Sequence, residues 1–187
     1  LEQRIFCRQK SRSQGRLPAA EKGEKMAQII DGKAISQTIK DEVKKEVQEL
    51  SKKGIPVTLA VIQVGEDPAS TVYVNNKKRA CAYTGIRSLS YNLPESAAQE
   101  ELLSLIGQLN EREDVNGILV QLPLPGHMDE DAVIEAICPR KDVDGFHPQN
   151  VGALCIGKPG FVPCTPAGII ELLKRSGIEI AGKECVM

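Results

Sequence analysis

VTLAVIQV (residues 57–64), followed by GEDPAS (65–70), is the stretch of sequence that decides the fold. The first string is apolar at nearly every position and rich in β-branched side chains, which is typical of a strand buried on both faces of a sheet. The second string is a turn rich in Gly, Asp and Pro. The residues after it predict a helix over about 69–84, which Gly85 would terminate. A buried strand that turns directly into a helix indicates an α/β fold.

The same alternation continues on both sides of this unit. Apolar residues at every third or fourth position predict a helix over about 35–50. Downstream we expect a strand, a helix, a strand and two further helices, over 86–93, 96–110, 117–122, 129–137 and 166–175. Strands that alternate with helices in this way imply βαβ units and a largely parallel sheet. We therefore predict a three-layer α/β domain with a mainly parallel sheet.

Loops at one edge of this sheet are the expected place for a ligand. In parallel sheets, ligands bind beyond the carboxyl ends of the strands. Three loops should leave those ends, over residues 65–70, 123–128 and 139–150. Residues that carry chemistry are therefore sought in these loops and in the helices that follow them.

Composition narrows the class of protein. The 187-residue chain has a net charge of −1, so its overall charge does not indicate a nucleic-acid partner. No apolar run approaches the roughly 18 residues that cross a membrane. The six cysteines form no Cys-x-x-Cys pair, and with only two histidines they match no metal site. We expect no bound metal, and reduced thiols of a cytoplasmic protein.

Residues 1–25 differ from the rest of the chain. They contain seven Lys or Arg and three Glu, with no sustained apolar period. They also lack the apolar core of a secretory signal. We expect a disordered segment that is non-native or translated upstream sequence, with Met26 as the natural start.

Tyr73 and Lys77 lie four residues apart in the predicted helix 69–84, so they share one face. An amine beside an aromatic ring can transfer protons next to a stacked, planar substrate. The same pair is a frequent accident of surface helices. Taken alone, these two residues leave both interpretations open.

Polar side chains also occur in the other two loops. Gln121 ends the predicted strand 117–122, and its amide can bind either a ligand or a neighbouring loop. Asp142 and Asp144 lie in KDVDGF (141–146), a string with the composition of a tight turn. A carboxylate in a cleft can accept two N–H bonds from a ring amidine or guanidine, but an aspartate can also serve the turn alone.

Four strings occur together in one order: VGEDPASTVYVNNK (64–77), GILVQLPLPGHM (117–128), KDVDGFHPQNVG (141–152) and PCTPAG (163–168). With the opening AQIIDGKAIS (27–36), they resemble the bifunctional methylenetetrahydrofolate dehydrogenase/methenyltetrahydrofolate cyclohydrolase family, the FolD type. The resemblance runs from about residue 26 to residue 186.

The resemblance implies a role for each candidate residue. Lys77 matches the catalytic lysine, Gln121 the glutamine that bonds and tunes it, and Asp144 the aspartate that anchors the pterin ring. Tyr73 matches the tyrosine that stacks on the folate, and Asp142 a position that shapes the loop. The implied catalytic residues are Lys77, Gln121 and Asp144, and the implied substrate-binding residues are Tyr73, Gln121, Leu122, Pro123 and Asp144.

The resemblance also implies an activity in tetrahydrofolate one-carbon metabolism, with a connection to purine biosynthesis. The cyclohydrolase step adds water to a cationic methenyl carbon and opens the ring, which needs an acid/base group and a fixed pterin. The dehydrogenase step needs NADP beside the same carbon. The full-length family protein is expected to be a homodimer.

The implied domain organisation has three parts after the N-terminal segment. Residues 26–165 match the folate-binding catalytic domain, 166–180 a linker helix between domains, and 181–187 the start of the NAD(P)-binding Rossmann domain. No Gly-x-Gly-x-x-Gly string is present. We expect the Rossmann domain to be essentially absent and its cofactor-binding loop to lie beyond Met187. No residue of this chain is then expected to bind the cofactor, and we expect no dehydrogenase activity from it.

Two alternatives remain open from the residues. Tyr-x-x-x-Lys also occurs in short-chain dehydrogenases, but these need a glycine-rich turn well before the tyrosine, and this chain has none. The second alternative is an inactive fragment that only binds folate.

Overall fold

The structure, a computed structural model, describes residues 29–184. Within that part the elements are α1 Gly32–Lys52, β1 Thr58–Val64, α2 Pro68–Thr84, β2 Arg87–Leu93, α3 Gln99–Glu111, β3 Gly117–Val120, α4 Glu130–Ala136, α5 Pro148–Cys155 and α6 Cys164–Arg175. No helix among the described residues is long and apolar enough to span a membrane.

Two expectations fall on residues outside the described part. One is the upstream segment 1–25. The other is the cofactor-binding loop, which we expect beyond Met187. Met187 itself belongs to the final residues 185–187, which also lie outside the described part. Both therefore stay predictions from the sequence. Residues 181–184, the described part of the segment expected to start the Rossmann domain, are a turn and irregular backbone.

The strands form one parallel sheet in the order β2-β1-β3. β1 pairs along its whole length with β2, from Thr58 opposite Arg87 to Val64 opposite Leu93. On its other edge β1 pairs with the shorter β3. Because β1 is central and covered on both faces, six of its seven residues are buried, which explains its nearly continuous apolar sequence.

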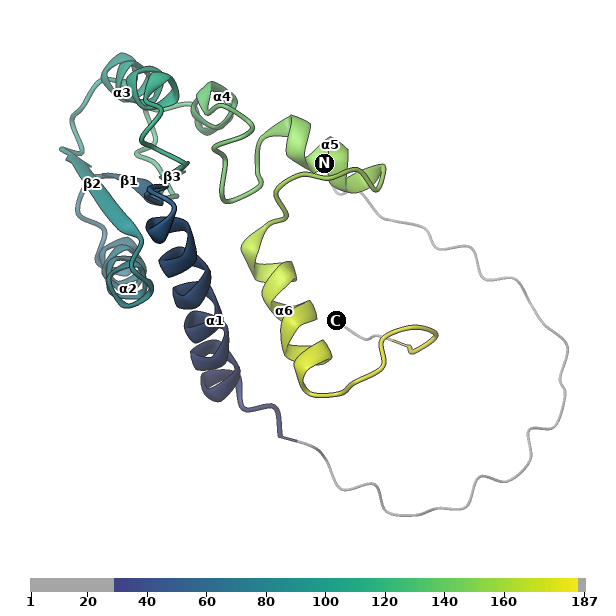
Figure 1. Cartoon of the computed structure of the whole chain (residues 1–187). Coiled ribbons are helices and arrows are strands. Elements are labelled where there is room, and N and C mark those ends of the chain that lie inside the picture. The colour runs from purple at the N-terminus through teal and green to yellow at the C-terminus, as the bar shows by residue number, and fades with distance from the viewer. Residues whose placement is uncertain (1–28, 185–187) are drawn as a thin grey trace, which may run out of the picture.

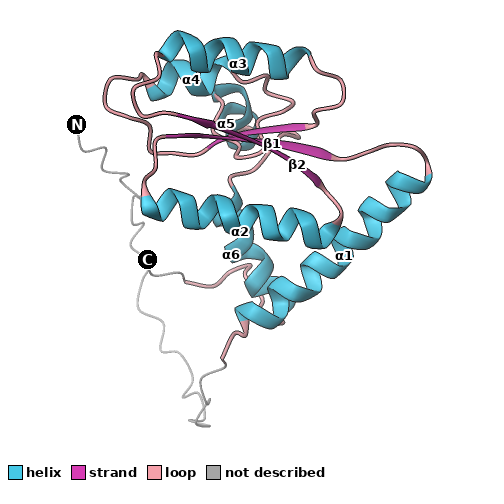
Figure 2. Cartoon of the chain, turned by 90° about the vertical axis from the view of Figure 1, so that its left-hand side faces the viewer, coloured by secondary structure: helices cyan, strands magenta, loops and turns pink. Residues whose placement is uncertain are grey.

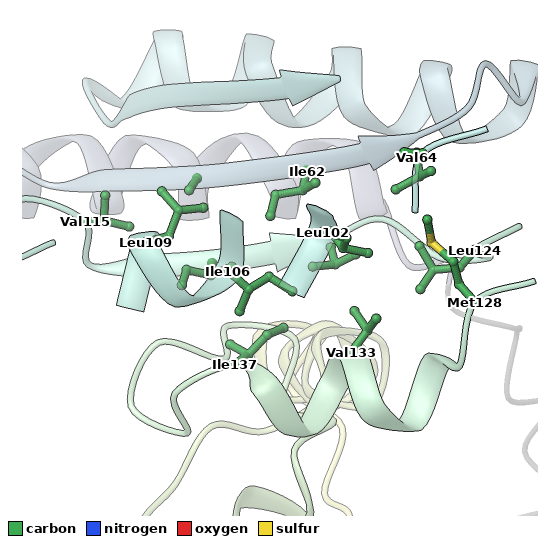
Figure 3. Close-up of a cluster of buried hydrophobic side chains, with 14 residues drawn as sticks. Ile62, Val64, Leu102, Ile106, Leu109, Val115, Leu124, Met128, Val133 and Ile137 are labelled. Atoms are coloured by element: carbon green, nitrogen blue, oxygen red, sulfur yellow. The ribbon is translucent and has the colours of Figure 1, made fainter. Parts of the chain in front are cut away.

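Helices cover both faces of the sheet, so the predicted three-layer α/β architecture is confirmed (Figure 2). On one face, α3 and α4 pack against β1 and β3. Figure 3 shows this larger core, in which Ile62 of β1 lies among side chains from both helices, including Ile106 and Val133. On the other face, Val74 of α2 packs against Val61 of β1 and its neighbours. Burial of each such aliphatic side chain contributes about 1.5–3 kcal/mol.

Local signals explain where α2 begins and ends. The carboxylate of Asp67 accepts a hydrogen bond from the Ser70 backbone amide at 2.7 Å, which caps the helix. Pro68 occupies the first turn, where its missing N–H costs nothing. Gly85 ends the helix with φ +87°, a left-handed conformation that favours glycine. These signals fix the helix that carries Tyr73 and Lys77.

Several predicted element bounds differ from the structure, and one helix was not predicted. The sequence predicted no helix between those at 129–137 and 166–175, but α5 forms there. His147 caps α5 by accepting a hydrogen bond from the Gln149 amide through Nδ1 at 3.1 Å, and Pro148 occupies its first turn. The last helix begins at Cys164 rather than Pro166, and β3 ends at Val120, one residue before Gln121.

Helix α1 lies between α2 and α6 (Figure 1). It contacts α2 along one side and α6 along another. An apolar groove of about 440 Å³ separates α1 from α6, and Ile35, Ile39, Ile169 and Leu172 contribute to its lining. Helix α6 itself has no fully buried side chain.

Candidate functional site

The site lies at the point in the sheet where successive strands are added on opposite sides of β1. The chain passes from β1 to β2 on one side of β1, and then crosses back to β3 on the other side. The carboxyl ends of β1 and β3 therefore open into a crevice between connections that leave in opposite directions. Helix α2 borders this crevice after β1, and the segment that begins at Gln121 borders it after β3.

Lys77 of α2 and Gln121, which follows β3, are joined directly. Lys77 Nζ donates a hydrogen bond to Gln121 Oε1 at 3.2 Å. The Gln121 side-chain nitrogen donates to the Leu122 carbonyl at 2.7 Å, which turns the amide oxygen toward the lysine. The Gln121 backbone amide also donates to Ile62 O of β1 at 2.8 Å. Both the backbone and the side chain of Gln121 are therefore fixed in place.

Asp144 is the third polar residue of the site. Its side chain is half-buried, and desolvation raises the pKa of its carboxyl above the ordinary value. The positive charge of Lys77 opposes this shift in pKa, and the negative charge of Asp142 adds to it. The structure thus brings Lys77, Gln121 and Asp144 into one electrostatic neighbourhood. A small hollow beside Asp144 is lined by apolar side chains that include Leu122 and Phe146.

Asp142 faces inward and is satisfied by its own loop. Its carboxylate accepts hydrogen bonds from the backbone amides of Gly145 at 3.1 Å and His147 at 2.9 Å. It also accepts one from Asn150 Nδ2 at 2.9 Å, and it is 2% exposed. Next to it, the Ile118 amide of β3 donates to Lys141 O at 2.7 Å, which ties the loop to the sheet. This carboxylate therefore holds the turn that presents Asp144.

The turn after Asp144 is packed tightly against the segment before α6. Gly145 has φ +70°, and a Cβ at this position would lie 2.9 Å from the backbone nitrogen of Pro163. Both the conformation and the close approach require glycine. On the other side of Asp144, the Cys164 thiol donates to Val143 O at 3.7 Å. The start of α6 is therefore in contact with both neighbours of Asp144.

Cys164 is a site neighbour that the sequence did not single out. Desolvation raises the pKa of its thiol, and the nearby Asp144 carboxylate raises it further. The string PCTPAG contained this cysteine, but nothing in the string predicts a contact with residues 143–145. His147 and Asn150 were missed for a similar reason, since their roles depend on the unpredicted helix α5.

The remaining predicted site residues lie at the open side of the crevice. Tyr73 is one turn before Lys77 on α2, and its side chain is 62% exposed. Pro123 is exposed and follows Leu122 through a cis peptide bond. Both residues therefore present solvent-exposed surface. Among the described residues no group of His, Cys, Asp or Glu could hold a metal ion.

The arrangement combines three chemical capacities. An amine held by a neutral amide can accept or donate a proton. A half-buried carboxylate can accept paired N–H bonds from a nitrogen-rich ring. An exposed aromatic face can stack on a planar group. Together these capacities fit a planar heterocycle whose reacting atom lies near the lysine.

Comparison with known proteins gives one consistent family. The profile of the family described as tetrahydrofolate dehydrogenase/cyclohydrolase, catalytic domain, matches residues 30–144. A curated relative from Lachnoclostridium phytofermentans, the bifunctional protein FolD, is 68% identical over 162 residues. That alignment covers 87% of this chain and 57% of the relative. The chain thus spans little more than half the length of the curated relatives it matches.

Two solved structures resemble this fold. The bifunctional enzyme FolD from Campylobacter jejuni is 54% identical, with a TM-score of 0.78, over 80% of this chain and 53% of the other. The enzyme from Trypanosoma brucei, solved with NADP cofactor and an inhibitor, is 42% identical. Its TM-score is 0.80, over 84% of this chain and 54% of the other.

Proposed function

Because the chain belongs to the tetrahydrofolate dehydrogenase/cyclohydrolase family, we propose that its catalytic site binds a folate and hydrolyses methenyltetrahydrofolate. The observation that carries the proposal is the hydrogen bond of 3.2 Å between Lys77 and Gln121, with Asp144 beside it. A short-chain dehydrogenase is excluded as the family, since the matched profile is a different one.

We assign a separate task to each residue. Lys77 is the acid/base group at the reacting carbon, and Gln121 orients its amine. Asp144 accepts N–H bonds from the pterin ring, and Tyr73 stacks on the flat part of the folate. Leu122 and Pro123, which follow Gln121, are assigned to contact the folate after β3. Fixing the substrate in this way converts attack by water into an effectively unimolecular step.

In the proposed step, the oxygen of a water molecule bonds to the cationic methenyl carbon while the water gives a proton to the Lys77 amine, which enters the step uncharged. The lysine then returns that proton to the ring nitrogen as its bond to the carbon breaks. The second water proton passes to solvent, and the carbon remains as a formyl group on the other nitrogen. The step needs neither an oxidant nor a reductant.

The dehydrogenase reaction of this family requires a dinucleotide, which supplies a hydride acceptor when bound. Dinucleotide phosphates bind at helix N-termini that follow strands. In the described part of the chain, all three such helices carry acidic residues at or within their first turn: Asp67, Glu100, Glu101, Asp129, Glu130 and Asp131. These residues do not fit a phosphate group, so no step is assigned to a dinucleotide held by them. This supports the proposal that the cofactor-binding loop of the whole protein lies beyond Met187.

We further propose the domain division suggested by the sequence, with residues 26–165 as the folate-binding domain, 166–180 as a linker between domains and 181–187 as the start of the dinucleotide domain. For the whole protein we propose NADP as the cofactor, a homodimer, a part in purine biosynthesis and a cytoplasmic location.

The decisive experiment is hydrolysis of methenyltetrahydrofolate, followed by the loss of its absorbance and corrected for the spontaneous reaction. The parent chain and Lys77→Met are compared, with Lys78→Met as the matched control on the same helix. We expect hydrolysis by the parent and the control, and none by Lys77→Met. A parent that binds a folate analogue without hydrolysing methenyltetrahydrofolate would be the inactive fragment, and would overturn the proposal.

A further inference from the structure

Two adjacent acidic residues of α1 hold the two helices that border the site. Asp41 accepts a hydrogen bond from the Tyr83 hydroxyl of α2 at 2.5 Å. Glu42 receives a bidentate pair from Arg175 of α6, at 2.9 and 2.7 Å. Neighbouring residues on a helix point about 100° apart. One helix can therefore bind α2 with one carboxylate and α6 with the next, as their arrangement in Figure 1 shows.

The contact to α2 is reinforced. The Gln37 side-chain nitrogen donates to Asp41 Oδ1 at 3.1 Å and to the Tyr83 hydroxyl at 2.9 Å. Lys44 lies over the Tyr83 ring, 4.7 Å from its centroid. Helix α2, which carries Lys77, is thus held to α1 by several interactions. Lys77 therefore keeps its position relative to α1.

The contact to α6 rests on far fewer interactions. No side chain of α6 is fully buried, and two of its isoleucines, Ile169 and Ile170, are 51% and 38% exposed. Leu172 lies close to Gly32 of α1, beside the apolar groove. The pair between Arg175 and Glu42 is the bidentate ion pair that joins the two helices. An ion pair with this geometry defines the direction of α6 more strongly than a loose apolar contact does.

The other end of α6 reaches the site. Cys164, its first residue, donates to Val143 O, and the segment before it packs on Gly145. Asp144 lies between these two contacts. A shift of α6 must therefore move the turn that carries Asp144, while Lys77 stays with α1 and α2.

Resting on the function proposed above, we infer that Glu42 and Arg175 are positioning residues whose ion pair sets the place of Asp144 relative to Lys77. Neither residue touches the substrate. They act through α6, and the loss of their pair loosens the pterin-binding side of the site while the lysine side stays in place.

Charge reversal and charge exchange test this inference. Glu171 also pairs with Arg175, at 2.9 Å, so all proteins carry Glu171→Gln to remove its repulsion from a reversed charge. In this background Arg175→Glu, Glu42→Arg and the double exchange are compared. Lys52→Glu, which breaks the pair of Lys52 with Glu49 elsewhere on α1, is the matched control.

The first measurement does not depend on folate. Iodoacetamide alkylation of Cys164 is followed by peptide mass spectrometry, with Cys155 as the internal reference, since both thiols are exposed and only Cys164 has its pKa raised by Asp144. We expect each reversal to speed alkylation of Cys164 about two- to fivefold, the effect of a pair with this exposure, and the exchange to restore the parent rate. Equal rates in all proteins, or an exchange that fails to restore the rate, would overturn the inference.

The second measurement is the dissociation constant of a folate analogue. Each reversal should raise it by a similar factor, the exchange should restore it, and Lys52→Glu should leave it unchanged. A change at Cys164 without a change in affinity would refute the link to Asp144. If the background protein binds no folate at all, the proposed function fails, and the Cys164 result alone decides whether the pair fixes α6.

Discussion

Asp142 and Asp144 lie two residues apart in one turn, yet their carboxylates have opposite surroundings. Asp142 is 2% exposed and accepts three hydrogen bonds from Gly145, His147 and Asn150. Asp144 is half-buried, and desolvation raises the pKa of its carboxyl. The Asp142 carboxylate is occupied by hydrogen bonds within the protein, whereas the Asp144 carboxylate remains available to a ligand. Replacing Asp142 and replacing Asp144 should therefore have different effects on the protein.

We predict that Asp142→Ala destabilises the fold and that Asp144→Ala weakens binding. Loss of Asp142 leaves buried donors without an acceptor, which should lower the free energy of unfolding by about 3 kcal/mol. Loss of Asp144 removes charge-assisted bonds to the pterin, which should cost on the order of 1.5–3 kcal/mol of affinity. Urea denaturation measures the first effect, and calorimetric titration with a folate analogue measures the second. If Asp142→Ala loses more affinity than Asp144→Ala at unchanged stability, the two assignments are reversed.

A second prediction concerns pH. The carboxyl pKa of Asp144 is higher in the folded chain than its value of about 3.9 in an unfolded one, so the folded state binds more protons between these values. Stability from this group is therefore lost as the pH rises from about 4 through the folded pKa. Asp144→Asn does not titrate, and it should gain stability relative to the parent as the pH rises to 7. Urea denaturation across this range gives the comparison.

Asp67 provides a control with the opposite sign. Its hydrogen bonds with Ser70 lower the pKa of its carboxyl, so its contribution to stability is present above about pH 3.9 and is lost as the pH falls. Asp67→Asn should thus lose stability relative to the parent as the pH rises. Parallel curves for both variants would contradict the two pKa directions.

Lys141, in the same turn string, supports a third prediction. Its ammonium donates to the carbonyl oxygens of Leu109, Asn110 and Arg112, at 3.0, 2.8 and 2.7 Å. These carbonyls lie at the end of α3, where a positive charge also favours the helix dipole, and that of Arg112 also accepts a hydrogen bond from the Val115 amide at 3.3 Å. Lys141→Met should lower the free energy of unfolding by about 2–3 kcal/mol in urea denaturation. The exposed Lys158→Met should change it by less than about 0.5 kcal/mol.

These residues show which parts of the structure could be predicted from the sequence. The buried run of β1 and the caps of α2 act locally, so the strands, most helices and the layer arrangement were predictable from periodicity and turn residues. The joining of Lys77 to Gln121 was implied by the family resemblance, and the fold then places them together. The bonds of Lys141 to α3 span about thirty residues, and no local pattern encodes them.

Helix α5 was missed for a different reason. Its eight residues are too few for a clear apolar period, and His147 is an uncommon capping residue. Pro148 in its first turn was a usable signal, because proline is frequent there. The contact of Cys164 with Val143 depends on how α6 returns to the sheet, which only the assembled fold determines.

The last prediction separates proton transfer from simple charge at Lys77. Arginine keeps the positive charge and much of the length of lysine, but it does not give up a proton in a protein. If Lys77 transfers a proton, Lys77→Arg should lose about 10²–10⁴-fold in the rate of methenyltetrahydrofolate hydrolysis. Gln121→Ala should lose less, since Gln121 only orients the amine. Both rates are corrected for the spontaneous reaction, and binding of a folate analogue verifies that each variant is folded. A Lys77→Arg rate above about a tenth of the parent rate would lie outside the proton-transfer range. Lys77 would then not be the base, and that role would be assigned to a water molecule held between Gln121 and Asp144.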